Sequence, residues 1–414
     1  MITNFEKPEI LSPAGDMDCL KSALNFGADA VFLAGKMFGM RSAPQNFDND
    51  QLKKACDLAH AKGARIHVTC NTLPRNNEIP HLQEFMENAQ ACGVDAFIIA
   101  DLGVFEAAKK YAPKVQRHIS TQAGVTNYAA ANVLYNMGAS RVVLAREIPL
   151  DEIAEMRAKV PKELEIECFV HGAMCVSFSG RCLISSYMTG RDANHGDCAQ
   201  PCRWKYHLYE ENRQGQYFPV EETGDGTYLY NSRDLCMIEH MDDVLNSGID
   251  SLKIEGRMKS VYYIATLVKT YRMLIDEYYE KGVISEERMA YYEKEFAKAE
   301  NRPSGVGFYA GMPRAAGHLY EESRNPLIQE FIAYILDYDE KTQMAYIEVR
   351  NHFAVGAGAE VFGPNCLNRP FVISDLFDEN KEALSVAKTP MQRLYMKIPF
   401  SVKRHDMIRR RRSI

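Results

Sequence analysis

The feature that most constrains the fold is an alternation of short apolar runs with helix-like stretches over the first 260 residues. Each run ends in a polar residue or a glycine, and each except the last precedes a stretch with helical spacing, such as Leu52, Ala55 and Ala59. The eight runs are Glu9–Ser12, Ala30–Ala34, Arg65–Thr69, Ala96–Ala100, Arg117–Thr121, Arg141–Leu144, Leu164–Val170 and Ser251–Ile254. Eight strands that alternate with helices predict an α/β fold, a (βα)8 TIM-like barrel. A doubly wound sheet is the alternative, although no G-x-G-x-x-G follows the first run.

The regular spacing of the runs is interrupted once, between the seventh and the eighth. About 80 residues separate these two runs, from His171 to Gly248, whereas connections within compact domains are usually far shorter. Long loops of this kind are usually functional, and a loop after a barrel strand leaves the C-terminal face, where the active sites of such barrels lie. We therefore expect the active site at this cysteine-rich insertion.

The rest of the chain divides into a helical stretch, a linker and a β-rich end. We assign residues 1–300 to the barrel domain, residues 301–325, which contain Gly and Pro, to a linker, and residues 326–414 to a second domain. A chain of 414 residues exceeds what one hydrophobic core usually serves, which supports two domains. The apolar runs of the second domain predict a small C-terminal β-barrel; they are Ile332–Leu336, Met344–Val349, Ala359–Phe362 and Arg393–Met396.

Cysteine usage indicates metal or redox chemistry. The chain has eleven cysteines, an odd number, and its N-terminus shows no signal peptide, so we expect a cytoplasmic protein without disulfides. Four cysteines follow the pattern Cys175-x6-Cys182-x15-Cys198-x3-Cys202 within the loop 171–204, and four thiolates suit zinc or an iron–sulfur cluster. The irregular spacing, without paired C-x2-C knuckles, favours a [4Fe–4S] cluster. Zinc, plain buried thiols, and Cys236 as a substitute ligand are the alternatives.

Polar side chains follow most of the predicted strands. In a barrel they line one mouth, and polar groups that converge in a concave site mark an active centre. We predict catalytic roles for four of them: His171 as a proton shuttle, Glu255 as a base or hydroxyl acceptor, and Arg146 and Arg257 as a clamp for a carboxylate or phosphate. The others are Asn71, Asp101, Gln122, Glu147 and Lys259. For any single residue the alternative is a helix cap or a surface ion pair.

The charge of the chain is unevenly distributed. Its net charge is −6, but from Arg393 to the end eight residues are basic and one, Asp406, is acidic. This basic tail predicts an RNA-contacting arm, with a solvated and frayed terminus as the alternative. No run of 18 apolar residues occurs, so we expect no membrane span. The protease motif H-E-x-x-H and the hydrolase motif G-x-S-x-G are absent from the sequence.

The residues around the first two cysteines carry a family resemblance. At Glu167–Ser185 the sequence ECFVHGAMCVSFSGRCLIS resembles the signature of the collagenase-like peptidases of unknown catalytic type. The likeness extends from residue 9 to about residue 275, and the β-rich end is similar to the family's C-terminal domain. Further matching segments are Leu11–Gly15, Gly27–Val31, Ser120–Ala123, Arg191–Asn194, Cys198–Trp204 and Ser251–Arg257.

Length and layout are most similar to the bacterial members of this family that modify tRNA. The resemblance implies an enzyme that hydroxylates the wobble uridine of tRNA to 5-hydroxyuridine, with prephenate as the co-substrate. It also implies a [4Fe–4S] cluster on Cys175, Cys182, Cys198 and Cys202. Two other functions stay open, namely a peptidase, as the family name suggests, and a non-catalytic iron–sulfur scaffold. The absent protease motifs and the redox-type cysteine loop favour RNA hydroxylation, with tRNA and a small carboxylate as partners.

Overall fold

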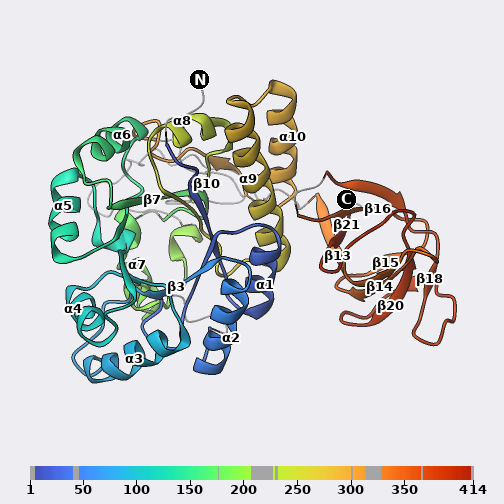
Figure 1. Ribbon diagram of the computed structural model, residues 1–414, viewed down its shortest axis with the longest axis horizontal. Helices are drawn as coiled ribbons and strands as arrows, with labels where there is room; N and C mark the ends of the chain where they lie inside the picture. Colours follow the sequence, from blue (N-terminus) through green and yellow to red (C-terminus); the bar gives the residue numbers. More distant parts are fainter. Residues whose placement is uncertain are drawn as a thin grey trace, which may run out of the picture.

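The computed structural model describes residues 5–40, 46–175, 177–206, 227–228, 232–299, 302–313, 328–364 and 367–411. Of the features expected from the sequence, residues 301 and 314–325 of the linker and Arg412 of the basic tail lie outside these ranges. Figure 1 shows a barrel surrounded by helices and a smaller β domain beside it.

Eight parallel strands form a closed barrel. They are β1 (Glu9–Pro13), β2 (Ala30–Leu33), β3 (Arg65–Cys70), β4 (Ala96–Ile99), β5 (Gln116–Ile119), β6 (Arg141–Val143), β7 (Glu165–Gly172) and β11 (Ser251–Ile254). Ser251 of β11 pairs with Glu9 of β1 on one side and with Glu167 of β7 on the other, which closes the ring. Each of the eight predicted runs coincides with one of these strands, so the (βα)8 prediction is confirmed and the doubly wound alternative is wrong.

Helices cover the outside of the barrel, as Figure 1 shows. They are α1 (Met17–Asn25), α2 (Asn49–His60), α3 (Leu82–Cys92), α4 (Leu102–Tyr111), α5 (Tyr128–Met137), α6 (Leu150–Lys159), α8 (Met241–Asn246), α9 (Val261–Lys281) and α10 (Glu286–Ala297). Local signals set their ends: Asp48 and Gln51 form a capping box at the start of α2, and Gly93 ends α3 with φ 90°. No described helix is both long and apolar enough to cross a bilayer.

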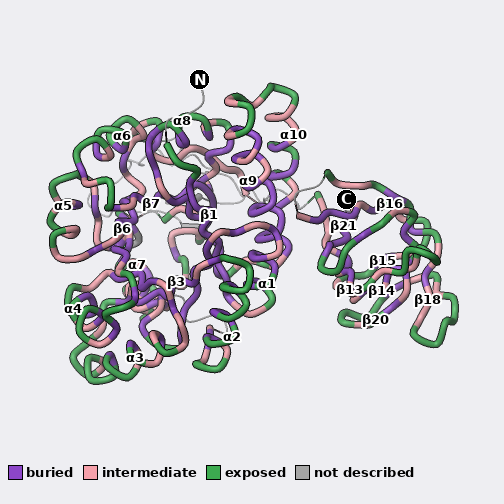
Figure 2. The backbone as a smooth tube through the Cα atoms, viewed as in Figure 1, coloured by how far each residue is buried: buried purple, intermediate pink, exposed green. Residues whose placement is uncertain are grey.

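The barrel strands are almost entirely buried (Figure 2), yet their inward faces carry charge. Arg141 is fully buried and donates to Glu9 at 2.7 Å and to Glu167 at 2.8 Å. Lys253 donates to the second oxygen of Glu167 at 2.7 Å. A buried charge is tolerated only when it is paired and hydrogen-bonded, and this network meets that condition. The barrel interior toward the N-terminal ends of the strands therefore contains a buried ion-pair network.

The insertion between β7 and β11 crosses the barrel mouth. It contains α7 (Ile184–Thr189), β8 (Lys205–Tyr206), β9 (Thr227–Tyr228) and β10 (Asp234–Cys236). Strand β10 pairs antiparallel with the end of β7, through Leu235 and Gly172, and β12 (Ser304–Gly305) adds to β10 in parallel. The insertion is thus fastened to the C-terminal end of the barrel, as expected for an active-site loop.

The C-terminal domain is a separate antiparallel sheet with its own core. Its seven strands follow the order β17 (Arg369–Val372), β16 (Gly358–Phe362), β21 (Met407–Arg411), β13 (Gln329–Asp339), β14 (Met344–Val349), β20 (Arg393–Lys397) and β18 (Leu376–Phe377), and β15 (Phe353–Ala354) pairs with β19 (Val386–Ala387). The sequence predicted a small β-barrel here, and the structure confirms a separate β domain, formed as an antiparallel sheet.

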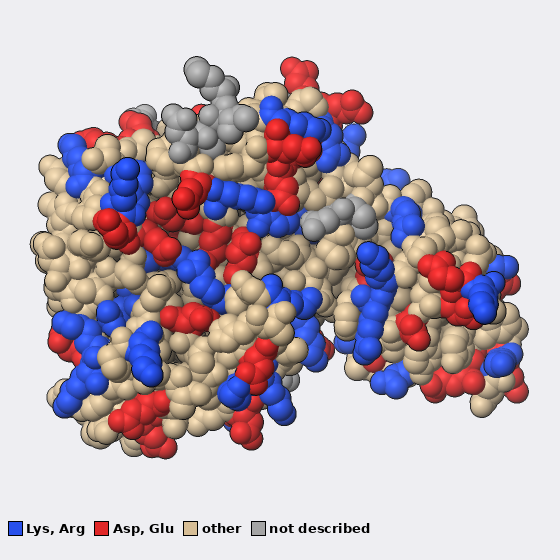
Figure 3. All heavy atoms as spheres, viewed as in Figure 1, with Lys and Arg blue, Asp and Glu red and all other residues tan. Residues whose placement is uncertain are grey.

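The alternative of a solvated, frayed terminus is wrong for the described part of the basic tail, while its contact with RNA stays a prediction. Residues Met407–Arg411 form strand β21, which lies between β16 and β13. Arg409 is fully buried; it donates to Glu295 of α10 at 2.6 Å and to Glu360 of β16 at 2.7 Å. These arginines therefore belong to the sheet and to the contact between the two domains. On the face shown in Figure 3, basic and acidic side chains are interspersed over both domains.

Candidate active site at the barrel mouth

The C-terminal ends of the barrel strands and the cysteine loop enclose a cavity of about 220 Å³. The four cysteines singled out by their spacing all line it, together with polar side chains from several strand ends. These polar residues are Thr69, Asn71, Ser120, Gln122, Arg146, Glu147, Lys253, Glu255 and Arg257. The structure thus brings two separate sequence signals, the cysteine motif and the strand-end residues, into one place.

Backbone amides already hold three of the four thiols. Ser177 donates its N–H to the Sγ of Cys175 at 3.4 Å, and Ile184 donates to the Sγ of Cys182 at 3.4 Å. Gln200 donates to the Sγ of Cys198 at 3.3 Å. Hydrogen bonds from N–H groups to cysteine sulfur are one of the means by which proteins tune iron–sulfur clusters. Each bond comes from the residue two positions after the cysteine, so the local turn builds the contact.

Burial and the neighbouring cysteines disfavour negative charge on two of these thiols, those of Cys175 and Cys202. Burial raises the pKa of Cys202 to about 11, and the other three cysteines of the motif add to the shift. Burial likewise raises the pKa of Cys175, with contributions from Cys182 and Cys198. Four thiolates in one cavity need positive charge among them, which iron ions supply. The donor set therefore fits an iron–sulfur cluster, although no three His, Cys, Asp or Glu side chains of the described ranges meet closely enough to hold a single metal ion.

Three of the four predicted catalytic residues line the cavity. Arg146 stacks its guanidinium on the ring of Phe169, 3.8 Å from the centroid, and donates to the carbonyl of Ala173 at 2.6 Å. Arg257 is only 5% exposed. Glu255 follows β11, and its backbone N–H donates to the His171 carbonyl at 2.8 Å, which fixes the position of its backbone. The roles of these three residues stay predictions.

His171 is placed differently from the prediction. Its ring stacks on Phe296 at 5.3 Å and lies 3.2 Å from the Tyr271 hydroxyl, so it faces the helices outside the barrel. Burial lowers its pKa to about 3. The cause is a one-residue bulge: Phe169 pairs with Lys253 but the next pair joins His171 to Ile254, which reverses the alternation of β7. His171 is therefore a neutral packing residue rather than a proton shuttle at the mouth.

Three other candidates, Asp101, Cys236 and Lys259, also lie away from the residues that line the cavity. The ammonium of Lys259 lies over the ring of Tyr263, 5.1 Å from its centroid. Asp101 caps α4, accepting from the backbone N–H of Val104 at 3.0 Å, which is the structural alternative expected for a single strand-end residue. Cys236, on β10, pairs with His171 in the sheet and packs against the barrel core. Among the described residues that line the cavity, the cysteines are Cys175, Cys182, Cys198 and Cys202.

The sequence reasoning missed Thr69 and Lys253, which lie within strands rather than after them. A usable signal was present, because polar residues recur at every second position of strands β3, β5 and β11. Examples are His67 and Thr69, His118, Ser120 and Gln122, and Ser251, Lys253 and Glu255. Alternate residues of a barrel strand point inward, so this period indicates a polar interior.

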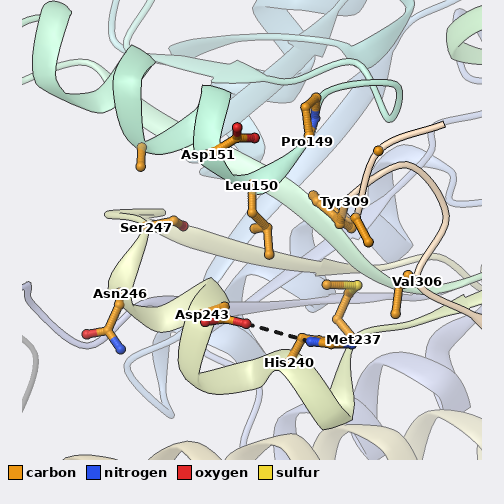
Figure 4. Close-up of a pocket in the computed structure, with 13 residues that line it drawn as sticks. Pro149, Leu150, Asp151, Met237, His240, Asp243, Asn246, Ser247, Val306 and Tyr309 are labelled. Carbon is orange, nitrogen blue, oxygen red and sulfur yellow. Dashed lines mark ion pairs between the residues drawn. The ribbon is translucent and has the colours of Figure 1, made fainter.

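A second, larger groove of about 670 Å³ lies beside the barrel (Figure 4). Leu150 of α6, Met237 and Tyr309 line it, and one ion pair, between His240 and Asp243 at 3.6 Å, crosses its edge. Its walls are mostly apolar and include none of the four motif cysteines. The chemistry suggested by the sequence therefore belongs to the smaller cavity at the mouth.

Family models match most of the chain. The one described as peptidase family U32 matches residues 15–318. The chain belongs to peptidase family U32. A second model, described as the C-terminal domain of peptidase family U32, matches residues 328–409 of this U32 chain. The resemblance seen in the cysteine motif is thereby confirmed.

Proteins similar to this U32 chain carry different functional names. A tRNA hydroxylation protein P1 of Bacillus subtilis (strain 168) is 38% identical over 408 residues, which cover 98% of this chain and 95% of the relative. An uncharacterized protease of Methanocaldococcus jannaschii is 37% identical and covers 86% of both chains. A 23S rRNA 5-hydroxycytidine synthase of Escherichia coli (strain K12) is 35% identical over 68% of this chain and 41% of the relative.

Proposed function

We propose that this chain is an RNA-modifying enzyme that hydroxylates a pyrimidine base, namely the wobble uridine of tRNA, at C5. The observation that carries the proposal is the shared cavity, in which the four motif cysteines lie beside the polar strand ends of the barrel. The near full-length similarity to a protein named for tRNA hydroxylation supports RNA as the substrate. The similarity to a 5-hydroxycytidine synthase supports C5 of a pyrimidine as the site of reaction.

The cysteines Cys175, Cys182, Cys198 and Cys202 would hold a [4Fe–4S] cluster. When bound, this cluster supplies one-electron redox chemistry next to the barrel mouth. Replacing C5–H by C5–OH is a two-electron oxidation, so an enzyme for this reaction needs redox chemistry and an oxygen-supplying partner. A cavity that combines thiols with cationic side chains meets the first need and can bind an anionic co-substrate.

The two arginines would bind that co-substrate. Arg257 is almost completely buried and Arg146 is held by Phe169 and Ala173, so both side chains are preorganised. A guanidinium pairs with a carboxylate through two parallel hydrogen bonds. We propose a small carboxylate in this position, with prephenate as the compound that the family resemblance implies. Glu255, beside them, would accept a hydrogen bond from a hydroxyl of the same ligand or take up its proton.

The loop around the cavity offers surfaces for unpaired bases. Phe178, Tyr187 and Trp204 are 51%, 83% and 42% exposed, and Phe178 lies between Ser177 and Ser179, which both line the cavity. Exposed aromatic rings stack with the bases of single-stranded RNA whatever their sequence. Enzymes that act on a base extrude it from its stack into a pocket. An aromatic rim would hold the neighbours of the extruded base.

The test starts with the cofactor. Full-length protein purified without oxygen should contain about four iron and four sulfide per chain and absorb broadly near roughly 400 nm, and Cys175→Ala should lose both. The tRNA of cells that lack the gene should then regain 5-hydroxyuridine with the wild-type gene and not with Cys175→Ala, as measured by nucleoside mass spectrometry. An intact cluster with no hydroxylated nucleoside would overturn the proposal and favour a non-catalytic iron–sulfur scaffold protein.

Proteolysis is the second candidate, because the family and one relative bear protease names. It predicts that the purified protein cleaves a denatured protein and that Glu255→Gln abolishes the cleavage. Cleavage that survives further purification, together with unchanged tRNA nucleosides, would favour the peptidase over the hydroxylase.

A further inference from the structure

One side chain that lines the cavity has no hydrogen-bond partner among the residues that the structure describes. The carboxamide of Gln122 is 3% exposed, lines the cavity, and neither its nitrogen nor its oxygen is bonded. Most buried polar side-chain atoms have a partner, because leaving one unsatisfied is costly. An amide that lacks both partners at the edge of a cavity is prepared for a ligand that supplies them.

Three hydrogen bonds hold the turn that carries Gln122. They fix the backbone position from which its side chain extends. Its N–H donates to the Ser120 hydroxyl at 3.3 Å, and its carbonyl accepts from Arg181 of the cysteine loop at 2.6 Å. The preceding Thr121 hydroxyl donates to the carbonyl of Leu144 at 2.9 Å. Because Arg181 directly precedes Cys182, the loop that carries the thiols also holds the Gln122 turn in place.

A second unsatisfied group lies on a nearby strand end. The hydroxyl of Thr69, on β3, is 3% exposed, lines the same cavity and has no hydrogen-bond partner. Asn71, two residues further, is already engaged, since its side-chain oxygen accepts from the backbone of Met40 at 3.2 Å. The cavity floor thus offers one amide and one hydroxyl that the protein itself leaves unused.

We infer that Gln122 binds the Watson–Crick edge of the target pyrimidine and that Thr69 adds a further hydrogen bond. This inference rests on the proposed function. Uracil presents the N3–H donor beside the O4 acceptor, and a carboxamide supplies the complementary acceptor and donor side by side. Rotation of the amide by half a turn exchanges its two groups and matches cytosine, which presents N4–H beside N3. Gln122 accordingly matches uracil, the base of the proposed function, and also cytosine, the base in the name of one relative.

The proposed contact keeps the reacting carbon of the base accessible. Binding through N3 and O4 leaves C5, the neighbour of C4, unhindered by Gln122. The amide therefore selects and orients the base, which makes Gln122 a substrate-binding residue distinct from the redox residues.

The test measures how the protein distinguishes two short single-stranded RNAs that differ only at their central base, uridine or 3-methyluridine, by fluorescence anisotropy. The methyl group removes the N3–H donor. Wild-type holoprotein should bind the uridine RNA about 10- to 100-fold more tightly, as for a bidentate base contact. Gln122→Met, which keeps the size of the side chain, should reduce this ratio to about 1. Thr69→Val should also reduce the ratio, but by a factor several-fold smaller than Gln122→Met does.

The control variant is Gln83→Met on the solvent side of α3, which should keep the wild-type ratio. Gln83 is exposed, and its side-chain nitrogen donates to Glu87 at 3.0 Å. Equal iron content and circular dichroism would show that Gln122→Met is folded. If it is not, Gln122→Leu replaces it, because an aliphatic side chain supplies neither the acceptor for N3–H nor the donor for O4 and should again abolish the preference.

The outcomes separate this inference from the proposed function. A wild-type protein that hydroxylates tRNA but shows no preference for uridine over 3-methyluridine, or a Gln122 variant that keeps the preference, would overturn the inference and leave the function standing. A wild-type protein with an intact cluster that neither binds RNA nor hydroxylates it would remove the function itself.

Discussion

At the scale of single residues, burial decides the chemistry of the polar groups inside the barrel. His67 and His118 are fully buried with their rings 4.8 Å apart. Burial lowers the pKa of His67 to about 4 and that of His118 well below its ordinary value. Arg141, by contrast, keeps its charge because three carboxylates surround it. The barrel interior thus contains neutral imidazoles on β3 and β5 and paired ions on β1, β6 and β7.

His67 predicts a loss of stability in mild acid. The folded protein keeps the ring neutral down to about pH 4, whereas the unfolded chain takes up a proton near pH 6.5. Stability from this residue is complete above about pH 6.5 and is lost as the pH falls toward 4. Between pH 7 and pH 5 the free energy of unfolding should fall by about 2 kcal/mol less in His67→Phe than in wild type.

Denaturant titrations at both pH values measure this difference, and any constant packing cost of the larger ring cancels within the variant. His352→Phe, at an exposed position, should keep the wild-type change. An unaltered pH response in His67→Phe would show that burial of this imidazole does not contribute to acid sensitivity.

A second residue-scale prediction separates Cys202 from Cys236. Cys202 lines the cavity and interacts with the other three motif cysteines, whereas Cys236 packs against the core at the strand β10. Cys202→Ala should therefore lose iron and sulfide, and Cys236→Ala should keep both. Iron and sulfide analysis after anaerobic purification measures this. If Cys236→Ala loses iron and Cys202→Ala retains it, then Cys236 is the cluster ligand and Cys202 is not.

At the scale of elements, the pairing of β7 with β11 positions the site. Gly172 at the end of β7 has φ +112°, and a Cβ there would lie 2.4 Å from the Glu255 carbonyl. The bulge just before Gly172 turns His171 outward. It also places the backbone of Gly172 in close contact with Glu255 at the mouth. Glycine is required at this point both for its backbone conformation and for the close approach.

Gly172→Ala should therefore destabilise the protein by about 2–4 kcal/mol and displace Glu255. Gly63→Ala is the matched control, since Gly63 also has a positive φ, +73°, but nothing lies within 4 Å of its Cβ position. It should cost only about 1 kcal/mol. Chemical denaturation of both variants gives the comparison, and equal losses would mean that the contact with Glu255 does not strain the chain.

At the scale of the whole molecule, one buried arginine joins the two domains. Burial by itself would raise the pKa of Glu295, but the charge of Arg409 outweighs it and holds that pKa at about 2. Lys298 of the barrel domain bridges the same carboxylates, at 2.6 Å from Glu295 and 3.0 Å from Glu360. The contact is therefore a network in which Arg409 supplies the central charge.

Arg409→Met should lower the free energy of unfolding by about 3–5 kcal/mol, because it leaves two carboxylates with only one cation. Limited proteolysis should also separate the two domains sooner. Arg411→Met, at the exposed end of the same strand, should change stability by less than about 0.5 kcal/mol. If both variants behave alike, Arg409 does not hold the domains together. Deleting residues 409–412 would remove part of β21, so loss of RNA binding in such a truncation would report on folding.

The sequence by itself determined the alternation of strands and helices, the insertion after the seventh strand and the cysteine motif. Periodicity and turn residues are local properties, and they suffice to predict a barrel and its active face. The cysteines also stand within 28 residues of one another, so their spacing carried the prediction that they act together.

Only the tertiary structure decided which polar residues face the cavity. A single extra residue in β7 turns His171 outward, while Gln122, Arg146, Glu255 and Arg257 stay at the mouth. The end of the basic tail is a sheet strand because it pairs with β13 and β16, and this pairing accompanies the contact of Arg409 with Glu295, 114 residues earlier in the chain. Strand register and contacts between distant residues arise only when the elements pack, because inward and outward faces are defined by pairing with neighbours and not by the local sequence.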